Sequence, residues 1–508
     1  MALVSKVVIL VALLHVTLGF PILMRRAEEG RRWIYLPFYS QAEDEKMIFN
    51  KILRLNRESP QKLSEGDIAL RSIRSAWNCP TGNCFWPKSS DGTVHVPYTF
   101  SLVYSVDDRA RITAAMQEFT TMTCIRFIPR TAETNFLQLT SSPRSGCWSY
   151  IGKIGGGQAL NLEQQGCLEK GIIEHELSHA LGFIHENNRS DRDAYVKIQW
   201  QYVSESDHYN LNRQTDSNNL GLPYDYNSVM HMGRYSYTNT AGMATIVPIP
   251  DPNISIGQRY GLSNLDIAKI NKLYNCNLCR TLLSEPTGRF SFNLSPSRWT
   301  RGSCLWLIRI PSEQGSSKHP QVVLKFNTFY IQPSPSCFSN YITVYDGDSR
   351  TSPVLLARAC AVRQALAIVA SSYHMLLEFF SDGRNASNYF SASYNSVNCG
   401  GTLTSTKGVV TSPNFPSEYP PSLDCIWTII APLGNKIYLR MNSFELEDSD
   451  DCTYDYLTIS DSDGFLGKYC GYYGMLPMLF SGNSLILTFH TDEFLEFQGF
   501  NATYIFQS

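Results

Sequence analysis

The spacing of apolar residues changes several times along the chain, and each change predicts a different structure. Near the N-terminus, residues 7–14 form a short apolar run that follows Lys6 and precedes small residues around Gly19. This is the layout of a signal peptide that is cut after Gly19. The alternative, a membrane anchor, is disfavoured because the run is shorter than the ~20 residues that a span needs. We therefore expect residues 1–19 to be a signal peptide and the protein to be secreted.

Helical spacing appears further along the first half of the chain. The apolar side chains between residues 171 and 183 are those of Ile172, Ile173, Leu177, Ala180, Leu181 and Phe183. Their spacing predicts a deeply buried helix. Gly182 can adopt a positive φ, so we expect the helix to end there and the chain to turn back.

From Cys279 onward the pattern becomes that of strands and turns. Two stretches share one layout of four cysteines, and each has a Tyr-, Leu- and Ile-rich segment after its third cysteine, at 341–346 and 456–461. The cysteines are Cys279, Cys304, Cys337 and Cys360, then Cys399, Cys425, Cys452 and Cys470. With about 110 residues in each copy, the repeat predicts two all-β sandwiches that arose by duplication.

Composition indicates a multidomain, exported protein. A chain of 508 residues is too long for one ordinary core. Hydrophobic residues at 43% and charged residues at 17% are typical of a folded protein. The net charge of -2 gives no reason to expect a nucleic acid or an anionic membrane as partner. The 14 cysteines, an even number, predict disulfides formed in an oxidising compartment. Sequons for N-glycosylation agree with export and lie at Asn188, Asn253, Asn293, Asn385 and Asn501.

A composition shift separates an N-terminal arm from the rest. Residues 20–74 contain no cysteine and many charged residues, whereas cysteines begin abruptly at Cys79. Arg71 and Arg74 lie just before this boundary and suit a trypsin-like processing enzyme. We expect a propeptide over residues 20–74. The alternative on composition alone is a disordered N-terminal arm.

Three histidines lie in and just after the predicted helix. His175 and His179 are four residues apart and share one helix face, and the turn after Gly182 can return His185 to the same metal. Three neutral imidazoles make the open, catalytic type of zinc site, which leaves a position for water. Zinc lowers the pKa of that water towards about 7. Glu176 can then accept the proton as general base and pass it to the leaving amine.

The alternative for these histidines is a set of core side chains with no metal. It is the better interpretation of any one histidine alone. The H-E-x-x-H pattern arises by chance in roughly one per cent of chains this long, and the added Gly and His lower that by roughly three orders of magnitude. The full set therefore favours zinc.

The segment from His175 to Asp193 resembles the extended zinc signature of the astacin family of metzincin proteases. Residues 228–231 (Ser-Val-Met-His) resemble the family's Met-turn. The resemblance covers residues 75–276 and implies an α+β metzincin-type zinc protease domain. It also implies that Met230 is the hydrophobic floor of the site and that Glu186 is linked to the buried mature N-terminus.

One position departs from the astacin pattern. The family usually has a tyrosine two residues after the Met-turn methionine, where it ligates zinc and then stabilises the tetrahedral oxyanion. Here the residue is Met232, which has no hydroxyl. Because deleting one oxyanion donor can cost about 10²–10³ in turnover, we expect altered activity. Tyr235 and Tyr237 are candidate substitutes.

The N-terminal arm shares a second motif with the family. Glu65-Gly66-Asp67 resembles the propeptide motif in which an aspartate takes the fourth zinc position and displaces the water, and the glycine lets the backbone approach closely. The match is partial, since Ser64 stands where the family often has an aromatic residue and Gly-Asp pairs are common in turns. We expect Asp67 to ligate zinc in the proenzyme and keep it latent.

The resemblance also implies a cysteine pairing. Astacin domains pair the first of four cysteines with the fourth and the second with the third. An additional close pair just inside the mature N-terminus is similar to that of hatching enzymes. The expected disulfides are Cys79–Cys84, Cys124–Cys276, Cys147–Cys167, Cys279–Cys304, Cys337–Cys360, Cys399–Cys425 and Cys452–Cys470.

The last stretch strongly resembles a CUB domain in three places: Cys399-Gly-Gly-Thr-Leu, the Pro-Asn-Phe-Pro turn at 413–416 and Cys425-Ile-Trp. The first copy is a diverged CUB domain. We place the two domains at residues 279–397 and 399–508.

The two copies differ at positions that matter for calcium. Calcium-binding CUB domains use one Glu and two Asp, which are hard oxygen ligands. The second copy has Glu447, Asp455 and Asp492, whereas the first has Gln332 and Asn340 and keeps only Asp382. We expect calcium in the second copy only; the alternative is an acidic rim without an ion.

The expected function is that of a secreted zinc endopeptidase, made as a zymogen, whose CUB domains dock onto an extracellular protein. The close cysteine pair and the two CUB domains favour the hatching-enzyme type, which dissolves egg-envelope glycoproteins. One alternative is a matrix-processing protease, although such enzymes usually carry more CUB copies and EGF-like modules. The other is a CUB-based binding protein with weakened catalysis, and Met232 is the only residue that favours it.

Overall fold

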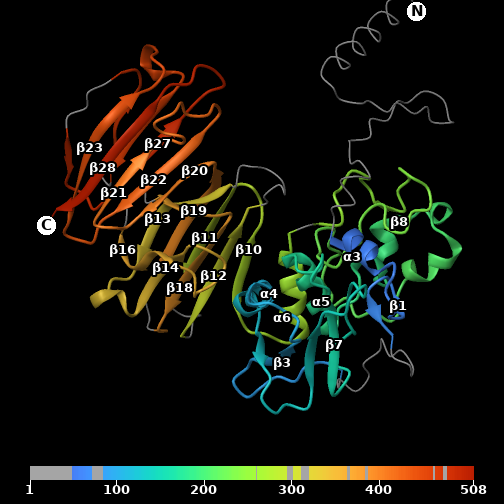
Figure 1. Ribbon diagram of the computed structural model, residues 1–508. Helices are drawn as coiled ribbons and strands as arrows, with labels where there is room; N and C mark the ends of the chain where they lie inside the picture. The colour runs from blue at the N-terminus through green and yellow to red at the C-terminus, as the bar shows by residue number, and fades with distance from the viewer. Residues whose placement is uncertain are drawn as a thin grey trace, which may run out of the picture.

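A mostly parallel sheet supports the first half of the chain in the computed structural model, which describes residues 48–70, 84–258, 260–294, 301–310, 320–362, 367–383, 387–461, 464–472 and 477–507. Its order is β4-β3-β5-β7-β6, and β6 is antiparallel to β7. The strands are β3 (Val94–Phe100), β4 (Ile125–Pro129), β5 (Phe136–Thr140), β6 (Cys147–Trp148) and β7 (Gly157–Leu162). Helices α4 (Val106–Met122), α5 (Lys170–Ala180) and α6 (Asn264–Leu273) share one apolar core with this sheet (Figure 1).

Two of these helices begin at the same kind of cap. Ser105 and Asp108 form a capping box at the start of α4, and Ser263 with Asp266 does so at the start of α6. Each box satisfies backbone N–H groups that the first helical turn leaves free. The remainder of this α+β domain contains β8 (Val196–Ile198), β9 (Ile246–Pro248) and short 3-10 helices at Glu186–Asn188, Arg192–Ala194, Trp200–Tyr202 and Glu205–Leu211.

An N-terminal segment packs across the α+β domain. It consists of α3 (Ile48–Asn56), β1 (Leu63–Ser64) and β2 (Ile68–Ala69). Ile48 and Ile52 belong to the core of the α+β domain, and Lys51 forms an ion pair of 2.6 Å with Glu169 at the start of α5. The backbone N–H of Ala69 donates to the carbonyl of Ser149. The segment is therefore an integral part of the folded protein.

Two β-sandwiches follow and repeat one topology. In the first sandwich, the sheet β10-β12-β18-β14-β15 faces the sheet β11-β19-β13-β16, with β17 also paired to β13. In the second, β20-β22-β27-β24-β25 faces β21-β28-β23-β26. Each sandwich opens with a strand that pairs in parallel with its neighbour. This matching topology confirms the predicted architecture of an α+β domain followed by two all-β domains.

The strands of the first sandwich are β10 (Cys279–Leu283), β11 (Gly288–Leu294), β12 (Gly302–Arg309), β13 (Gln321–Ile331), β14 (Asn340–Tyr345), β15 (Val354–Ala359), β16 (Ala361–Val362), β17 (Ala367–Val369), β18 (His374–Ser381) and β19 (Asn388–Val397). Those of the second are β20 (Cys399–Leu403), β21 (Lys407–Thr411), β22 (Asp424–Ile430), β23 (Lys436–Glu445), β24 (Tyr456–Asp461), β25 (Gly464–Tyr469), β26 (Met478–Phe480), β27 (Ser484–His490) and β28 (Gly499–Gln507).

The disulfides in the described residues match the expected pairs. They are Cys124–Cys276, Cys147–Cys167, Cys279–Cys304, Cys337–Cys360, Cys399–Cys425 and Cys452–Cys470. The signal peptide, the cut site near Arg74, Cys79 and the sequon at Asn385 lie outside the described residues. The helices within the described ranges are all too short or too polar to cross a membrane.

The first sandwich is joined to the α+β domain by apolar packing. Strand β12 is buried on both faces, because Leu305 and Leu307 enter the core of the α+β domain while Trp306 and Ile308 fill the space between the two sheets. A strand buried on both faces reads as a continuous apolar run, as this one does.

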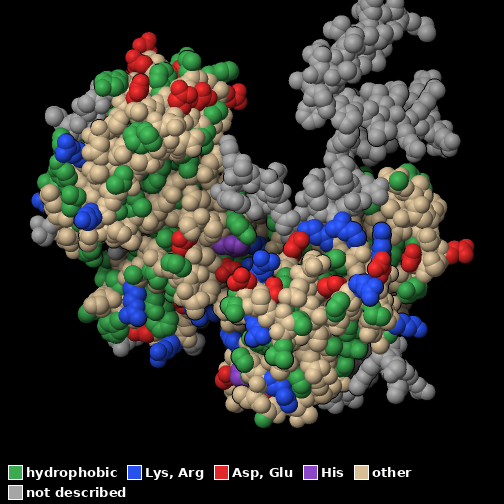
Figure 2. All heavy atoms as spheres, viewed as in Figure 1, with side chains coloured by type: hydrophobic (Ala, Val, Ile, Leu, Met, Phe, Trp, Pro, Cys, Tyr) green, Lys and Arg blue, Asp and Glu red, His purple; other side chains and the backbone are tan. Residues whose placement is uncertain are grey.

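A buried cluster of charges lies at the same boundary. Glu118 on α4 pairs with Arg309 on β12 at 2.7 Å and with Lys170 at the start of α5 at 2.6 Å. Lys170 also pairs with Asp348 of the first sandwich at 3.0 Å. Burial acts to raise the pKa of Glu118, but Arg309 and Lys170 lower it to about 2. Figure 2 shows acidic and basic side chains side by side along this boundary. The first sandwich therefore contacts the helix that carries His175.

The two sandwiches also contact each other through an apolar cluster. Val323, Val369 and Val397 of the first pack against Ile426 and Ile486 of the second. In addition, Val369 donates and accepts a 2.9 Å hydrogen bond with the hydroxyl of Thr402.

Replacing Arg309 with Met should lower the free energy of unfolding by about 3 kcal/mol, because one partner of a buried ion pair is removed and Glu118 stays buried. Urea denaturation followed by tryptophan fluorescence measures the loss. Arg350→Met is the matched control. Arg350 is 46% exposed and pairs with Glu378 within the first sandwich, so its loss should cost at most about 1 kcal/mol. Equal losses in the two variants would contradict a special role for the buried pair.

Candidate metal centre

Helix α5 places two of the three predicted ligands. Every residue from Gly171 to Ala180 is buried, so the helix runs through the interior. The chain leaves the helix at Gly182, which has φ 107°, and a Cβ there would lie 2.7 Å from the ring of Phe85. Gly182 thus turns the chain sharply, as predicted, and His185 returns to the face that His175 and His179 share.

Each imidazole is oriented by a hydrogen bond from its Nδ1. His175 donates to the carbonyl of Val229 at 2.8 Å, and His179 donates to the carbonyl of Phe183 at 2.8 Å. His185 pairs through Nδ1 with the Glu65 carboxylate at 2.9 Å. With Nδ1 used in this way, the three Nε2 atoms point towards one another, and those of His175 and His185 are 3.3 Å apart.

The carboxylate of Asp67 lies at the point where the three Nε2 atoms meet. Its oxygens are 2.8 Å from His175, 3.3 Å from His185 and 3.4 Å from His179. The side chain is fully buried. Burial opposes its charge, yet His185 and His179 hold the pKa of Asp67 well below its usual range. The expected position of Asp67 therefore agrees with this geometry.

This set of side chains fits zinc. Three imidazole nitrogens and one carboxylate oxygen lie within 4.8 Å of one another, which is the number and type of donors in a four-coordinate zinc site. Calcium and magnesium prefer oxygen donors, so a site dominated by imidazole does not suit them.

Glu176 lies on α5 next to His175 and has two free oxygens. Both are buried and have no hydrogen-bond partner among the described residues. Burial raises the pKa of Glu176 well above its usual range, and the charge of Asp67 raises it further. A carboxylate with no partner beside a metal centre is available to exchange a proton.

The Met-turn is held in place by α6. The Asp266 carboxylate accepts hydrogen bonds from the Ser228 hydroxyl at 2.6 Å and from the Val229 N–H at 2.8 Å. The carbonyl of Val229 orients His175, so Asp266 at the start of α6 supports the metal site indirectly, through Val229. Met230 is buried in the core of the α+β domain, as expected for a floor. The support from Asp266 was not apparent in the sequence, where its only signal was a capping box.

The side chain of Met232 has polar and apolar neighbours in the interior of the protein. It is fully buried, and its sulfur accepts a 3.2 Å contact from the side-chain amide of Asn187. It belongs to a second apolar cluster with Phe49, Val196 and Ile246. Met232 is therefore a core residue.

Glu186 is the centre of a buried ion network. Its carboxylate contacts Lys269 on α6 at 2.6 Å and Arg189 at 3.0 Å, and it accepts from the N–H of Asp225. Lys269 is a partner that sequence reasoning missed. The link between Glu186 and the mature N-terminus stays a prediction.

The N-terminal segment fits closely against the histidines. Gly66 has φ 95°, and a Cβ there would lie 2.4 Å from Leu53 and 2.6 Å from the hydroxyl of Tyr237. The ring of Phe49 meets His185 edge to face at 4.8 Å. Phe49 thereby supplies an aromatic contact that Ser64 cannot. Sequence reasoning also missed Glu65, whose second oxygen accepts from Gln214 at 2.8 Å.

The sequon at Asn188 is inaccessible in this fold. The side chain is fully buried, and its Nδ2 donates to the carbonyls of Asn210 at 2.9 Å and Asn212 at 3.0 Å. A glycan on Asn188 is incompatible with these contacts.

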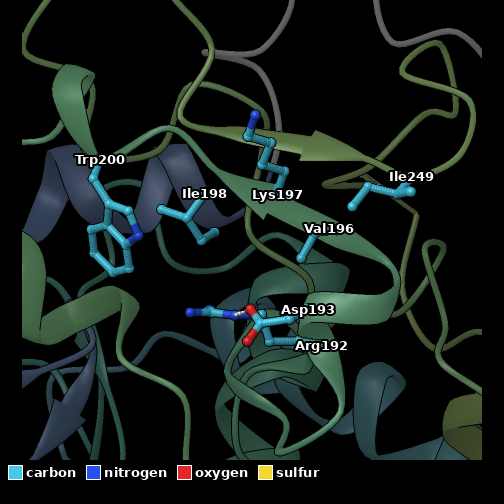
Figure 3. A pocket seen from close by; sticks show the side chains of 7 residues that line it. All are labelled: Arg192, Asp193, Val196, Lys197, Ile198, Trp200 and Ile249. Atoms are coloured by element: carbon cyan, nitrogen blue, oxygen red, sulfur yellow. Dashed lines mark hydrogen bonds and ion pairs between the residues drawn. The ribbon is translucent and has the colours of Figure 1, made fainter.

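A separate open pocket of about 240 Å³ lies beside β8, and none of the three histidines lines it (Figure 3). Its lining residues are Arg192, Asp193, Val196, Lys197, Ile198, Trp200 and Ile249. Arg192 pairs with Asp193 at 2.6 Å and donates to the carbonyls of Asn187 and Leu211. Its guanidinium is therefore engaged in holding the loop that follows His185.

A second cluster of carboxylates lies in the second sandwich. Glu447, Asp455 and Asp492 each offer an oxygen within 4.8 Å of the others. Asp455 is buried and accepts from the Tyr419 hydroxyl at 2.6 Å and from the Asp492 N–H at 2.8 Å. Burial raises the pKa of Glu447, and the charges of Asp455 and Asp492 raise it further. In the part of the first sandwich that the structure describes, no such cluster is found around Asn340.

Comparison with known proteins identifies relatives of each part. The family model for astacin (Peptidase family M12A) matches residues 84–275, and that for the CUB domain matches residues 279–394 and 399–504. Embryonic protein UVS.2 of Xenopus laevis is 45% identical over 92% of this chain and 89% of its own length. Astacin-like metalloendopeptidase of Coturnix japonica is 46% identical over 71% of this chain and 86% of its own length. High choriolytic enzyme 1 of Oryzias latipes is 47% identical over 45% of this chain and 84% of its own length.

Proposed function

Because the chain belongs to the astacin family of zinc metalloendopeptidases and carries two CUB domains after its protease domain, we propose that it hydrolyses egg-envelope glycoproteins outside the cell. The convergence of His175, His179 and His185 beside an unpartnered Glu176 is the observation that carries the peptidase activity. The name of the choriolytic relative supports the envelope as substrate, and the disulfides support secretion.

The roles of the site residues follow from their contacts. His175, His179 and His185 would hold zinc through Nε2, and the ion would act as a Lewis acid and lower the pKa of a water molecule. Glu176 accepts the proton of the attacking water and delivers it to the departing amine. The Nδ1 hydrogen bonds of His175 to Val229 and of His179 to Phe183 keep these two rings in place during this exchange.

The N-terminal segment acts as a propeptide that blocks the site. Asp67 occupies the position at which water would lie, and Glu65 and Phe49 hold His185 from the same side. Substrate has no access to the histidines while these contacts persist. Cleavage near Arg74 would allow the segment to leave.

The second CUB domain binds calcium through Glu447, Asp455 and Asp492. The raised pKa values of Glu447 and Asp455 reflect burial and carboxylates that repel one another, and a divalent cation would remove that repulsion. This domain would then present an ordered end for docking onto substrate. Figure 2 shows acidic side chains gathered at one end of the second sandwich.

Replacing Glu176 with Gln in the processed protein should lower kcat for peptide hydrolysis by about 10²–10⁴, because no base remains to accept the proton. Zinc content, measured by atomic absorption, should stay at that of the wild type. Glu205→Gln at an exposed position is the control.

The processed wild type and the Glu176→Gln variant also test which substrate is cleaved. The processed wild type should release soluble fragments from isolated egg envelopes, and the Glu176→Gln variant should not. If the wild type cleaves a matrix protein such as procollagen and leaves envelopes intact, it is a matrix-processing protease. If it binds envelopes without cleaving any protein, the CUB-based binding protein is correct.

Replacing Asp67 with Ala should make the unprocessed protein partly active against a small peptide substrate, since water can then enter the fourth position. The unprocessed wild type should stay inactive. Asp91→Ala, at an exposed carboxylate, is the control. An unprocessed Asp67→Ala protein with no gain in activity would contradict latency through this residue.

Titration calorimetry of the full-length, zinc-loaded chain should detect calcium binding to one class of site. Asp455→Asn should abolish it, because the substitution removes one negative charge from the cluster. Asp450→Asn, at an exposed aspartate nearby, should leave it intact. Calcium binding that survives in Asp455→Asn would mean that the ion lies elsewhere.

A further inference from the structure

The hydroxyl of Tyr237 has an unusual environment beside the histidine site. It is buried and has no hydrogen-bond partner among the described residues. Burial raises the pKa of Tyr237 well above its usual value, and the charges of Asp67 and Glu65 raise it further. A buried polar group without a partner is unfavourable, so natural structures usually keep one only where it has a task.

The residues that cover this hydroxyl come from the N-terminal segment. A Cβ on Gly66 would lie 2.6 Å from the Tyr237 oxygen, and the rings of Phe49 and Tyr237 are 6.2 Å apart. Asp67, which follows Gly66, has its carboxylate among the three Nε2 atoms. When the segment leaves, the hydroxyl and the fourth metal position therefore open into the same space.

The backbone holds Tyr237 in a conformation that its side chain disfavours. Its φ is 62°, in the left-handed region that bulky residues rarely adopt. The neighbours fix this conformation from both sides. The hydroxyl of Thr245 donates to the carbonyl of Ser236 at 2.6 Å, and Thr238 forms a bridge with Val203. Strain of this kind persists only where surrounding contacts impose it, and it is concentrated at functional sites.

Met232 cannot supply the hydrogen-bond donor that the hydroxyl of Tyr237 offers. It has no hydroxyl, and its sulfur contacts the amide of Asn187 within a buried cluster. Of the two tyrosines that the sequence suggested, Tyr237 is the one whose hydroxyl contacts Gly66.

We propose that, once the N-terminal segment has left, the hydroxyl of Tyr237 donates a hydrogen bond to the scissile carbonyl oxygen of the substrate as negative charge develops on it. This rests on the peptidase function and adds a catalytic residue to it. The bond strengthens as the carbonyl carbon becomes tetrahedral, because the oxygen then carries more charge. The proton remains on the phenol throughout, so the proton balance between water, Glu176 and the leaving amine is unchanged.

The kinetic test compares Tyr237→Phe with Tyr209→Phe in the processed, zinc-loaded protein. Tyr237→Phe should lower kcat by about 10²–10³ with KM changed less than about threefold, since the lost bond matters in the transition state. Tyr209, which is 52% exposed, should tolerate the change. The unprocessed Tyr237→Phe protein should have an unchanged or higher Tm, because the hydroxyl that it loses has no partner. A kcat within about twofold of that of the wild type would overturn the proposal, and so would a rise in KM without a fall in kcat.

A second test does not depend on activity. Nitration by tetranitromethane, followed by peptide mass spectrometry, should modify Tyr237 only after processing, whereas Tyr209 should react in both forms. Equal modification of Tyr237 before and after processing, or none after it, would overturn the proposal. If the wild type hydrolyses no peptide, the peptidase function fails, yet the nitration result still reports separately whether the hydroxyl opens to the site.

Discussion

The structure depends on how three buried imidazole rings are held with their Nε2 atoms facing one another. Each ring needs an acceptor for its Nδ1 proton, and each acceptor comes from a different part of the chain. Val229 lies in the Met-turn, Phe183 follows α5, and Glu65 belongs to the N-terminal segment. Misplacing Val229 or Phe183 would rotate a ring away from the metal position, and Glu65 adds a third restraint while the N-terminal segment is in place. The sheet, the cap of α6 and the N-terminal segment therefore all serve one geometric requirement.

The first sandwich packs against the helix that carries two of these rings. Helix α5 carries two of the rings, and its first residue, Lys170, is paired with Glu118 and with Asp348 of the sandwich. Leu305 and Leu307 of the sandwich are part of the core in which α5 lies. The first sandwich thus packs against the base of the site.

Much of the site could be predicted from the sequence because its signal is local. The spacing of His175 and His179 on one helix face, the glycine at 182 and the neighbouring Glu176 all lie within one short segment. The duplication of the sandwiches was visible in the cysteine pattern for the same reason. The environment of Met232 could not be predicted, since a methionine in a motif does not show which side chains its sulfur will contact; in the structure it contacts the amide of Asn187.

The sequence by itself indicated the histidine cluster, the neighbouring glutamate and the order of the domains, since periodicity and residue chemistry carry that information, whereas the disulfide pairing followed from the resemblance to a known family. Only the tertiary structure decided which residues orient the rings and that Phe49 and Gly66 pack beside them. His185 and Glu65 are 120 positions apart, and Arg309 and Glu118 are separated by 191. Pairs so distant leave no periodic trace in a single sequence, because nothing short of the packed fold brings them together.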